Sequence, residues 1–153
     1  MLVLAGKIVI HAVDEDGTPL KDQIYITTIS QIEIESSWRE FTDTATITLP
    51  RLIDPDIKGL ENKSDFRKQL LLWAKYHPQI EIWLGYGSPT HLAFKGIIRE
   101  VNGRVPVVLK CEDDMYFFKQ RAVSFASDNA TLKDITSTFS KLNLGTIVPI
   151  NPN

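Results

Sequence analysis

Cysteine is almost absent from this sequence, because Cys111 is the only one among its 153 residues. A single cysteine cannot form a disulfide within the chain, so the fold must rest on its hydrophobic core. A domain of this length buries about 70% of the surface that its unfolded chain exposes, which is enough for one such core. The lack of a disulfide framework suits a reducing compartment.

Long apolar runs and an excess of basic residues are also missing. No apolar run approaches the roughly 20 residues that a membrane-spanning helix needs, so we expect no membrane span. The apolar residues 1–5 follow no basic segment, so we expect no signal peptide. The 17 lysines and arginines face 19 aspartates and glutamates, for a formal net charge of −2. A module that binds duplex nucleic acid usually carries a clear basic excess, so nucleic acid is not the expected main ligand.

The sequence also lacks the motifs that mark nucleophilic catalysis. Residues 85–88, Gly-Tyr-Gly-Ser, resemble a nucleophile elbow only loosely, and their flanks are typical of a turn after a strand. Ser88 is therefore interpreted as a turn residue. No glycine-rich loop opens a helix, as a phosphate cradle requires. The three histidines lie in no recognisable motif: His11, His77 and His91. We predict that the chain is not an enzyme and holds no cofactor.

Metal-binding spacings are missing as well. There is no C-x-x-C and no H-E-x-x-H, so the sequence does not support a zinc site. The acidic run 14–16 begins like a calcium loop but has no distal glutamate at the right spacing. The acidic run 112–114 is interpreted as a solvated turn, in which Asp113 caps a short helix over residues 114–119. We predict no metal site.

What the sequence does contain is alternation of apolar and polar residues, the pattern of β-strands. In residues 44–49, three apolar side chains point to one face and three threonines to the other. Asn102-Gly103 between two apolar runs predicts a hairpin with a type I′ turn. Gly96 within the first arm of that hairpin predicts a bulge or a sharp bend. The predicted strands are residues 7–13, 24–34, 44–49, 79–86, 92–101 and 104–111.

Two segments carry the spacing of amphipathic helices. Residues 64–76 form the first, with Ser64 as its cap and a proline shortly after its end. Residues 129–142 form the second, with Thr131 or Asn129 as its cap.

These elements together predict a mainly β fold. We expect a small barrel or a strongly bent antiparallel sheet with one or two peripheral α-helices. Residues 1–128 are the expected β-barrel domain. Residues 129–153 are the expected C-terminal helix and tail, which pack on the barrel or leave it.

The chain carries many large aromatic side chains for one small domain. Several fall on strand positions that the alternation marks as outward, notably Trp83 beside Glu81. Such side chains are either covered by the two helices or contact another subunit, since aromatics and arginine are enriched in interface cores.

Five segments stand in a distinctive order and spacing: residues 32–38, 41–51, 80–87, 94–101 and 109–116. They read IEIESSW, FTDTATITLPR, IEIWLGYG, FKGIIREV and LKCEDDMY. This order resembles the N-terminal barrel of phage baseplate-hub proteins of the late control protein D type, and the matching part of type VI secretion spike proteins. The resemblance covers about residues 24–120, and no single segment in it is a catalytic signature.

The resemblance implies a structural role. Family hub barrels are built like tail-tube subunits and join a ring that connects the tube to the spike around a central channel. Family hub chains usually carry two barrels, so that a trimer mimics six-fold symmetry, whereas this chain has one. The helix-like insert at 64–76 also looks longer than the family's usual connection. The single barrel leaves three alternatives: a truncated piece, a half-length relative that forms a hexamer, or a tube-adaptor relative.

We therefore expect a structural subunit of a phage-tail or contractile-injection baseplate hub, in a virion or prophage tail assembled in the bacterial cytoplasm. Its expected partners are further copies of itself, in a trimeric or hexameric ring, and other tail or baseplate proteins. DNA is expected at most to pass through the channel without specific binding, since a near-neutral chain neutralises few phosphates. The expected interface residues are Trp38, Arg39, Phe41, Arg51, Trp73 and Trp83.

The alternative function is a small-barrel module that binds an oligosaccharide or single-stranded nucleic acid, with Trp38 and Trp83 as stacking platforms. A binding module should gather its exposed rings in one groove, whereas a ring subunit should spread them over opposite sides. A third hypothesis, an enzyme such as a cell-wall hydrolase, would need a strongly shifted titratable group in a deep pocket.

Overall fold

The computed structural model describes residues 4–50, 63–87, 90–120, 129 and 131–141. The chain forms two compact units, Met1–Asp114 and Met115–Asn153, so the first unit ends before the expected domain boundary at residue 128. No helix in the described part of the chain is long and apolar enough to span a membrane.

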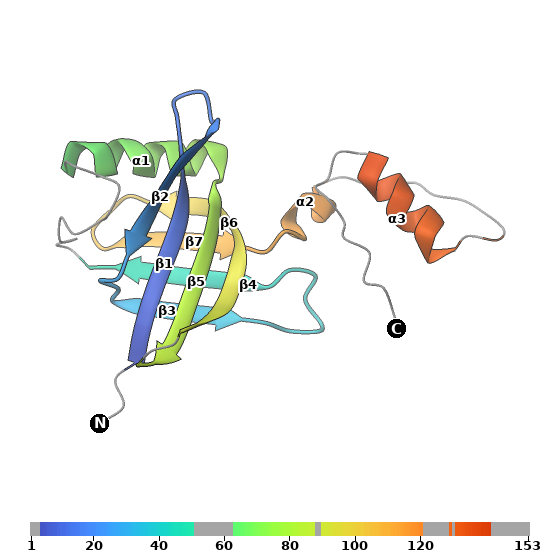
Figure 1. Ribbon diagram of the computed structural model, residues 1–153, viewed down its shortest axis with the longest axis horizontal. Coiled ribbons are helices and arrows are strands. Elements are labelled where there is room, and N and C mark those ends of the chain that lie inside the picture. The colour runs from blue at the N-terminus through green and yellow to red at the C-terminus, as the bar shows by residue number, and fades with distance from the viewer. Residues whose placement is uncertain (1–3, 51–62, 88–89, 121–128, 130, 142–153) are drawn as a thin grey trace. The chain divides into compact units, whose positions relative to one another are not determined.

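The described part of the first unit contains one antiparallel sheet and one helix (Figure 1). Its strands follow one another across the sheet in the order β2-β1-β5-β6-β7-β4-β3, so β2 and β3 are the edges of the described sheet. The predicted mainly β fold is confirmed, and the sheet is strongly bent and open rather than closed into a barrel. The elements are β1 Leu4–Val13, β2 Pro19–Ile26, β3 Gln31–Glu35, β4 Thr44–Leu49, α1 Lys63–Tyr76, β5 Gln79–Tyr86, β6 His91–Asn102 and β7 Val107–Glu112.

The bend of the sheet lies in β6, which changes its partner strand. Ile97 pairs with Gln79 of β5 on one side and with Glu112 of β7 on the other. Figure 1 shows the result: β1, β2 and β5 cross steeply over β3, β4 and β7. Strand β6 carries two register shifts, one against β5 between Leu92 and Phe94 and one against β7 between Ile98 and Glu100. Gly96 lies between them, where the strand passes from β5 to β7, so the predicted bend is present and the bulges lie on either side of it.

The core lies between the two halves of the bent sheet and follows the predicted alternation. Ile8 pairs with Ile26 on one side and with Ile82 on the other, and all three are buried. In the other half, Ile47 pairs with Leu109. Burying each such side chain stabilises the fold by about 1.5–3 kcal/mol. Helix α1 packs on β6 and β1 and adds buried apolar side chains, Leu70 and Trp73.

One predicted strand is wrong, because residues 24–34 do not form a single element. Residues 27–30 interrupt it, and the chain passes there from β2 at one edge of the sheet to β3 at the other. In the sequence the alternation lapses over these four residues, since Thr28 and Ser30 occupy the positions in phase with Ile26 and Ile32. A lapse of this length does not distinguish a crossover from an irregular strand.

The predicted hairpin between β6 and β7 is confirmed, but its turn type is wrong. Asn102 remains in the ladder opposite Val108, so the connection is longer than two residues and spans 103–106. The side-chain Oδ1 of Asn102 accepts a hydrogen bond from the Arg104 amide at 3.1 Å. Gly103 is not among the glycines with positive φ, which a type I′ turn requires.

The predicted helix over residues 64–76 is confirmed as α1, but it begins at Lys63, so Ser64 lies within the helix instead of capping it. His77 follows it in the left-handed conformation, with φ of 51°, and its amide donates to the Trp73 carbonyl at 3.1 Å. The His77 Nδ1 lies 2.9 Å from the carbonyl oxygen of Ile98. Because a carbonyl only accepts, Nδ1 carries the proton, and this bond helps to hold a conformation that non-glycine residues seldom adopt.

The second unit contains α2, Tyr116–Lys119, and α3, Leu132–Lys141. Thr131 caps α3: its amide donates to Asp134 Oδ2 at 2.9 Å, and the Asp134 amide donates back to Thr131 Oγ1 at 3.3 Å. The predicted end of this helix at residue 142 lies outside the described residues. Asp113 does not cap α2, whose N-cap is Met115.

Candidate assembly interface

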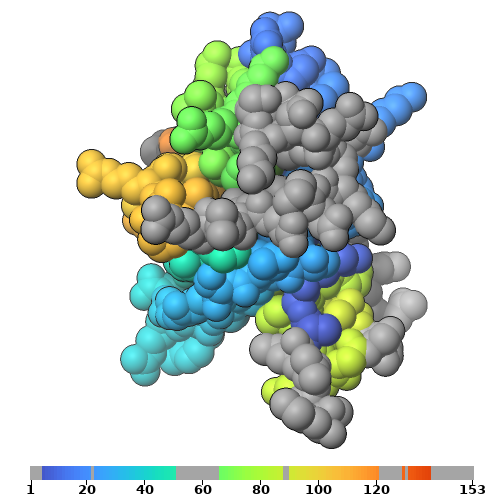
Figure 2. All heavy atoms as spheres, turned by 90° about the vertical axis from the view of Figure 1, so that its left-hand side faces the viewer, coloured from blue at the N-terminus to red at the C-terminus, as the bar shows by residue number. Residues whose placement is uncertain are grey.

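The loop that joins β3 to β4, residues 36–43, presents the most exposed aromatic side chain of the described chain. We call it the aromatic loop. Trp38 is 88% exposed and Phe41 is 58% exposed. The Arg39 guanidinium lies over the Trp38 ring, 5.0 Å from its centroid. Figure 2 shows this loop, in cyan, at a corner of the face that also carries α1 in green.

The tip of the aromatic loop is folded by local hydrogen bonds. The Ser37 carbonyl accepts the Glu40 amide at 3.2 Å, and the Ser37 Oγ accepts the Arg39 amide at 3.2 Å. Such a turn is typical of serine, whose hydroxyl can replace a backbone acceptor. The loop therefore projects its two rings from a defined turn.

The base of the aromatic loop is fixed to the end of β7. The Asp113 amide donates to the Asp43 carbonyl at 3.0 Å, and the Asp43 amide donates to Asp113 Oδ2 at 3.2 Å. Beside this pair, Thr42 Oγ1 donates to Glu112 Oε2 at 3.3 Å. This use of Asp113 explains why it does not cap α2.

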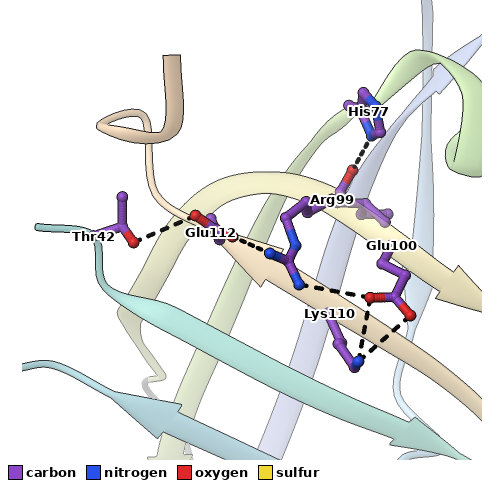
Figure 3. A network of polar contacts seen from close by, with 7 residues as sticks. Thr42, His77, Arg99, Glu100, Lys110 and Glu112 are labelled. Carbon is purple, nitrogen blue, oxygen red and sulfur yellow. Dashed lines mark hydrogen bonds and ion pairs between the residues drawn. The ribbon is translucent and has the colours of Figure 1, made fainter. Parts of the chain in front are cut away.

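A chain of charges extends this base across β6 and β7 (Figure 3). Arg99, the extra residue at the register shift in β6, contacts Glu112 Oε1 at 2.9 Å and Glu100 Oε2 at 3.5 Å. Lys110 contacts the same Glu100 oxygen at 3.2 Å. The Glu112 side chain is only 5% exposed, so it depends on Arg99 and Thr42 to stabilise its charge. We call Thr42, Arg99, Glu100, Lys110 and Glu112 the support network.

The support network was not predicted from the sequence. Residues 112–114 were expected to form a solvated turn, and this interpretation is wrong for Glu112, which is 4% exposed. The alternation of β7 places Lys110 and Glu112 on the same face, and this was the one usable signal. The burial of Glu112 depends on Thr42 and Arg99, which are distant in the sequence.

The structure brings together three of the six expected interface residues, because Trp38, Arg39 and Phe41 share the aromatic loop. Trp73 has no exposed surface and belongs to the core beneath α1, so we withdraw it from the expected interface. The spacing of the helix places Trp73 on one apolar face with Phe66 and Leu70, but it does not decide whether that face packs on its own sheet or on a neighbouring subunit. Arg51 lies outside the described residues.

Trp83 lies on another surface, the outer face of β5, where it is half-buried. Its Nε1 donates to Glu81 Oε2 at 3.1 Å. Lys7 places its Nζ 5.4 Å from the Trp83 ring centroid and 5.7 Å from that of Tyr25. The register sets this contact, because Lys7 is opposite Trp83. A ring covered by a lysine is not an open stacking platform, so this arrangement does not favour the binding-module alternative.

Two further features bear on the reactivity of the described chain, its single cysteine and the grouping of its metal-ligating side chains. Burial raises the pKa of the Cys111 thiol to about 12, so the thiolate that attacks or ligates is scarce near neutral pH. Within the described ranges, no group of three or more histidine, cysteine, aspartate or glutamate side chains could hold a metal ion. The arrangement is that of an exposed aromatic loop on a hydrogen-bonded and charged support.

No protein-family model matches this sequence, and no curated protein sequence matches it significantly.

Proposed function

We propose that this protein is a structural subunit of a phage-tail or contractile-injection baseplate hub, part of the ring between tube and spike. The observation that carries the proposal is the aromatic loop, with Trp38 88% exposed on a fixed base. The order of the five segments that resemble hub barrels supplies the class of assembly.

The composition of the aromatic loop suits a contact between proteins. Tryptophan and arginine are the residues most enriched among those that dominate binding energy, and the loop places Arg39 against Trp38. An exposed tryptophan contributes little to the folding stability of a monomer. Its burial in a partner's pocket, by contrast, removes a large apolar area from water.

The fixed base of the loop makes such a contact more favourable. Ordering a loop on binding costs about 0.5–1.5 kcal/mol for each side chain immobilised. Hydrogen bonds between Asp43 and Asp113 hold the base before binding. The entropic cost of ordering the loop on binding is therefore smaller.

The proposed setting is a ring of identical subunits together with other tail or baseplate proteins, in a virion tail assembled in the bacterial cytoplasm. Head-to-tail contacts close such rings, and they need two different surfaces on each copy. A chain of net charge −2 gives passing DNA few phosphate contacts. The proposed role includes no catalysis.

The test replaces Trp38 and Phe41 by serine and measures solution mass by light scattering after gel filtration. The expected result is loss of the assembled species, while circular dichroism shows that the separate chains remain folded. Leu71→Ser is the matched control, since Leu71 is an apolar residue of α1 that is 75% exposed. Assembly that survives the double substitution, or is lost equally in the control, would contradict the proposed role of the loop.

A further inference from the structure

The two edges of the sheet have a fixed relation to each other. Neighbouring strands pair antiparallel at every step of the order β2-β1-β5-β6-β7-β4-β3. Strand direction therefore reverses six times between the first edge and the last, and six reversals restore it. Strands β2 and β3 consequently run in the same direction when the sheet is viewed from its core side.

This relation limits how two copies can join their edges while keeping the core sides of their sheets continuous. If β3 pairs with β3 of a second copy, or β2 with β2, a two-fold axis relates the copies and the new pair is antiparallel. If β3 pairs with β2 of the next copy, the new pair is parallel and the contact repeats head to tail. Only the second arrangement lets one kind of contact repeat from copy to copy and close a ring, whereas a two-fold contact used alone stops at a dimer.

Charge on β3 opposes the two-fold arrangement. Gln31, Glu33 and Glu35 alternate along its exposed side, and all three are exposed. An antiparallel β3–β3 pair would bring Glu33 and Glu35 against the same residues of the second copy. Like charges across a strand pair are destabilising.

Strand β2 offers a better partner for β3. Lys21 is exposed on β2. Lys7 of the neighbouring strand lies beside Tyr25 of β2, with its Nζ 5.7 Å from the ring centroid, and adds a second positive charge close to this edge. Both edges also carry incompletely covered apolar side chains, with Leu20 of β2 42% exposed and Ile32 and Ile34 of β3 half-buried.

Two parallel registers keep all of β3 within β2 and match the alternation of their faces. In one, Gln31–Glu35 lies beside residues 19–23, which sets Lys21 beside Glu33. In the other, it lies beside residues 21–25, which sets Lys21 diagonal to Glu33. Side chains that are opposite or diagonal in a strand pair are within reach when one of them is long.

We propose that copies of this protein assemble head to tail by parallel pairing of β2 of one copy with β3 of the next, with Lys21 against Glu33 selecting this contact over two-fold pairing. The inference rests on the proposed function, since it specifies how the ring subunit meets its neighbour. It adds main-chain pairing as a second kind of contact beside the aromatic loop. Each copy would then present two different surfaces to its neighbours, its β2 edge and its β3 edge.

The test is a charge exchange between the two edges. Lys21→Glu and Glu33→Lys are prepared singly and together, and the double variant keeps the net charge of the natural sequence. Lys133→Glu, on α3, is the control with the same charge change as Lys21→Glu. Dissociation of the assembled protein is followed by light scattering over a dilution series, and circular dichroism checks that each variant is folded.

Each single exchange is expected to raise the apparent dissociation constant roughly tenfold, because it turns an attraction into a repulsion. The apparent dissociation constants of the double variant and of the Lys133→Glu control should both lie within about threefold of that of the unsubstituted protein. A two-fold β3 contact would respond to Glu33→Lys but not to Lys21→Glu, which would overturn the proposal.

The outcomes separate this proposal from the proposed function. If the unsubstituted protein assembles and neither single exchange weakens it, or the double variant does not recover, the β2–β3 contact is wrong while self-assembly stands. If the unsubstituted protein stays monomeric at every concentration, both proposals are wrong.

Discussion

At the scale of single residues, Gly96 shows most clearly how the sheet is bent. A Cβ added to Gly96 would lie 2.1 Å from the carbonyl oxygen of Glu112 and 2.9 Å from the Cα of Asp113. These are backbone atoms at the end of β7. The same two residues hold the base of the aromatic loop through other atoms. The absence of a side chain at Gly96 thus lets β6 and β7 approach closely enough for the support network to form.

We therefore expect Gly96→Ala to lower the free energy of unfolding by about 3 kcal/mol or more, because backbone cannot move aside as a flexible side chain can. Gly103→Ala is the matched control: nothing lies within 4 Å of its added Cβ. It should change stability by less than about 1 kcal/mol. Denaturant unfolding measures both, and equal effects would show that the close approach at Gly96 is not as described.

Cys111 gives a prediction that depends on pH. Burial raises its pKa from 9.0 to about 12, so the folded protein keeps the thiol proton where the unfolded chain loses it. The stability linked to this proton is complete below about pH 9 and is lost as the pH rises from there toward 12.

A thiol reagent at about pH 8 should therefore modify Cys111 at least roughly 100-fold more slowly in the folded protein than in denaturant. The free energy of unfolding should also fall as the pH rises above 9. Rapid modification of the folded protein would mean that Cys111 is not enclosed in the core.

At the scale of elements, the turn between β1 and β2 is attached to the end of α1. The Tyr76 hydroxyl donates to the Glu15 carbonyl at 2.6 Å. Gly17 has φ of 82°, and a Cβ there would lie 2.4 Å from the Tyr76 ring. The hairpin and the helix therefore depend on each other for their positions.

Gly17→Ala should destabilise the fold by roughly 2–4 kcal/mol, which combines the cost of positive φ with the clash against Tyr76. Gly87→Ala separates the two causes, since Gly87 has φ of 76° but nothing within 4 Å of its added Cβ. Its expected cost is about 1 kcal/mol. Thermal unfolding of the two variants gives the comparison, and a Gly17→Ala variant no less stable than Gly87→Ala would contradict the contact.

The elements differ in how far their sequences predict them. Strand β4 alternates cleanly between apolar and polar residues, β5 does so in its first half, and α1 carries apolar residues at helical spacing, so prediction and structure agree closely for them. The break at residues 27–30 was missed although the alternation lapses there, because so short a lapse does not show that the chain crosses from one sheet edge to the other. Local pattern contains no information about that route.

The residues of the candidate site also differ in how far the sequence predicts them. Trp38 and Phe41 were predicted because turn residues flank them and no pattern assigns them to a core. Glu112 was missed because its burial depends on Arg99 and Thr42, which the fold brings to it. Trp73 was misplaced because the apolar face of a helix can pack on its own sheet or on a neighbouring subunit, and the spacing does not choose between the two.

At the scale of the whole molecule, a hub-ring subunit is the proposal that best accounts for three features together. The sheet of unit 1 has two edges that run in the same direction, the aromatic loop is exposed on a fixed base, and the order of five segments resembles hub barrels. A tryptophan that is 88% exposed on such a base is a side chain of the kind that dominates binding once a partner covers it.

The most direct test of this account is the solution mass of the purified chain over a wide range of concentrations, by light scattering after gel filtration. The account predicts a defined species at three or six times the 17.3 kDa of one chain, with its population rising with concentration. A single species of 17.3 kDa at every concentration would contradict the central claim that this chain assembles with itself.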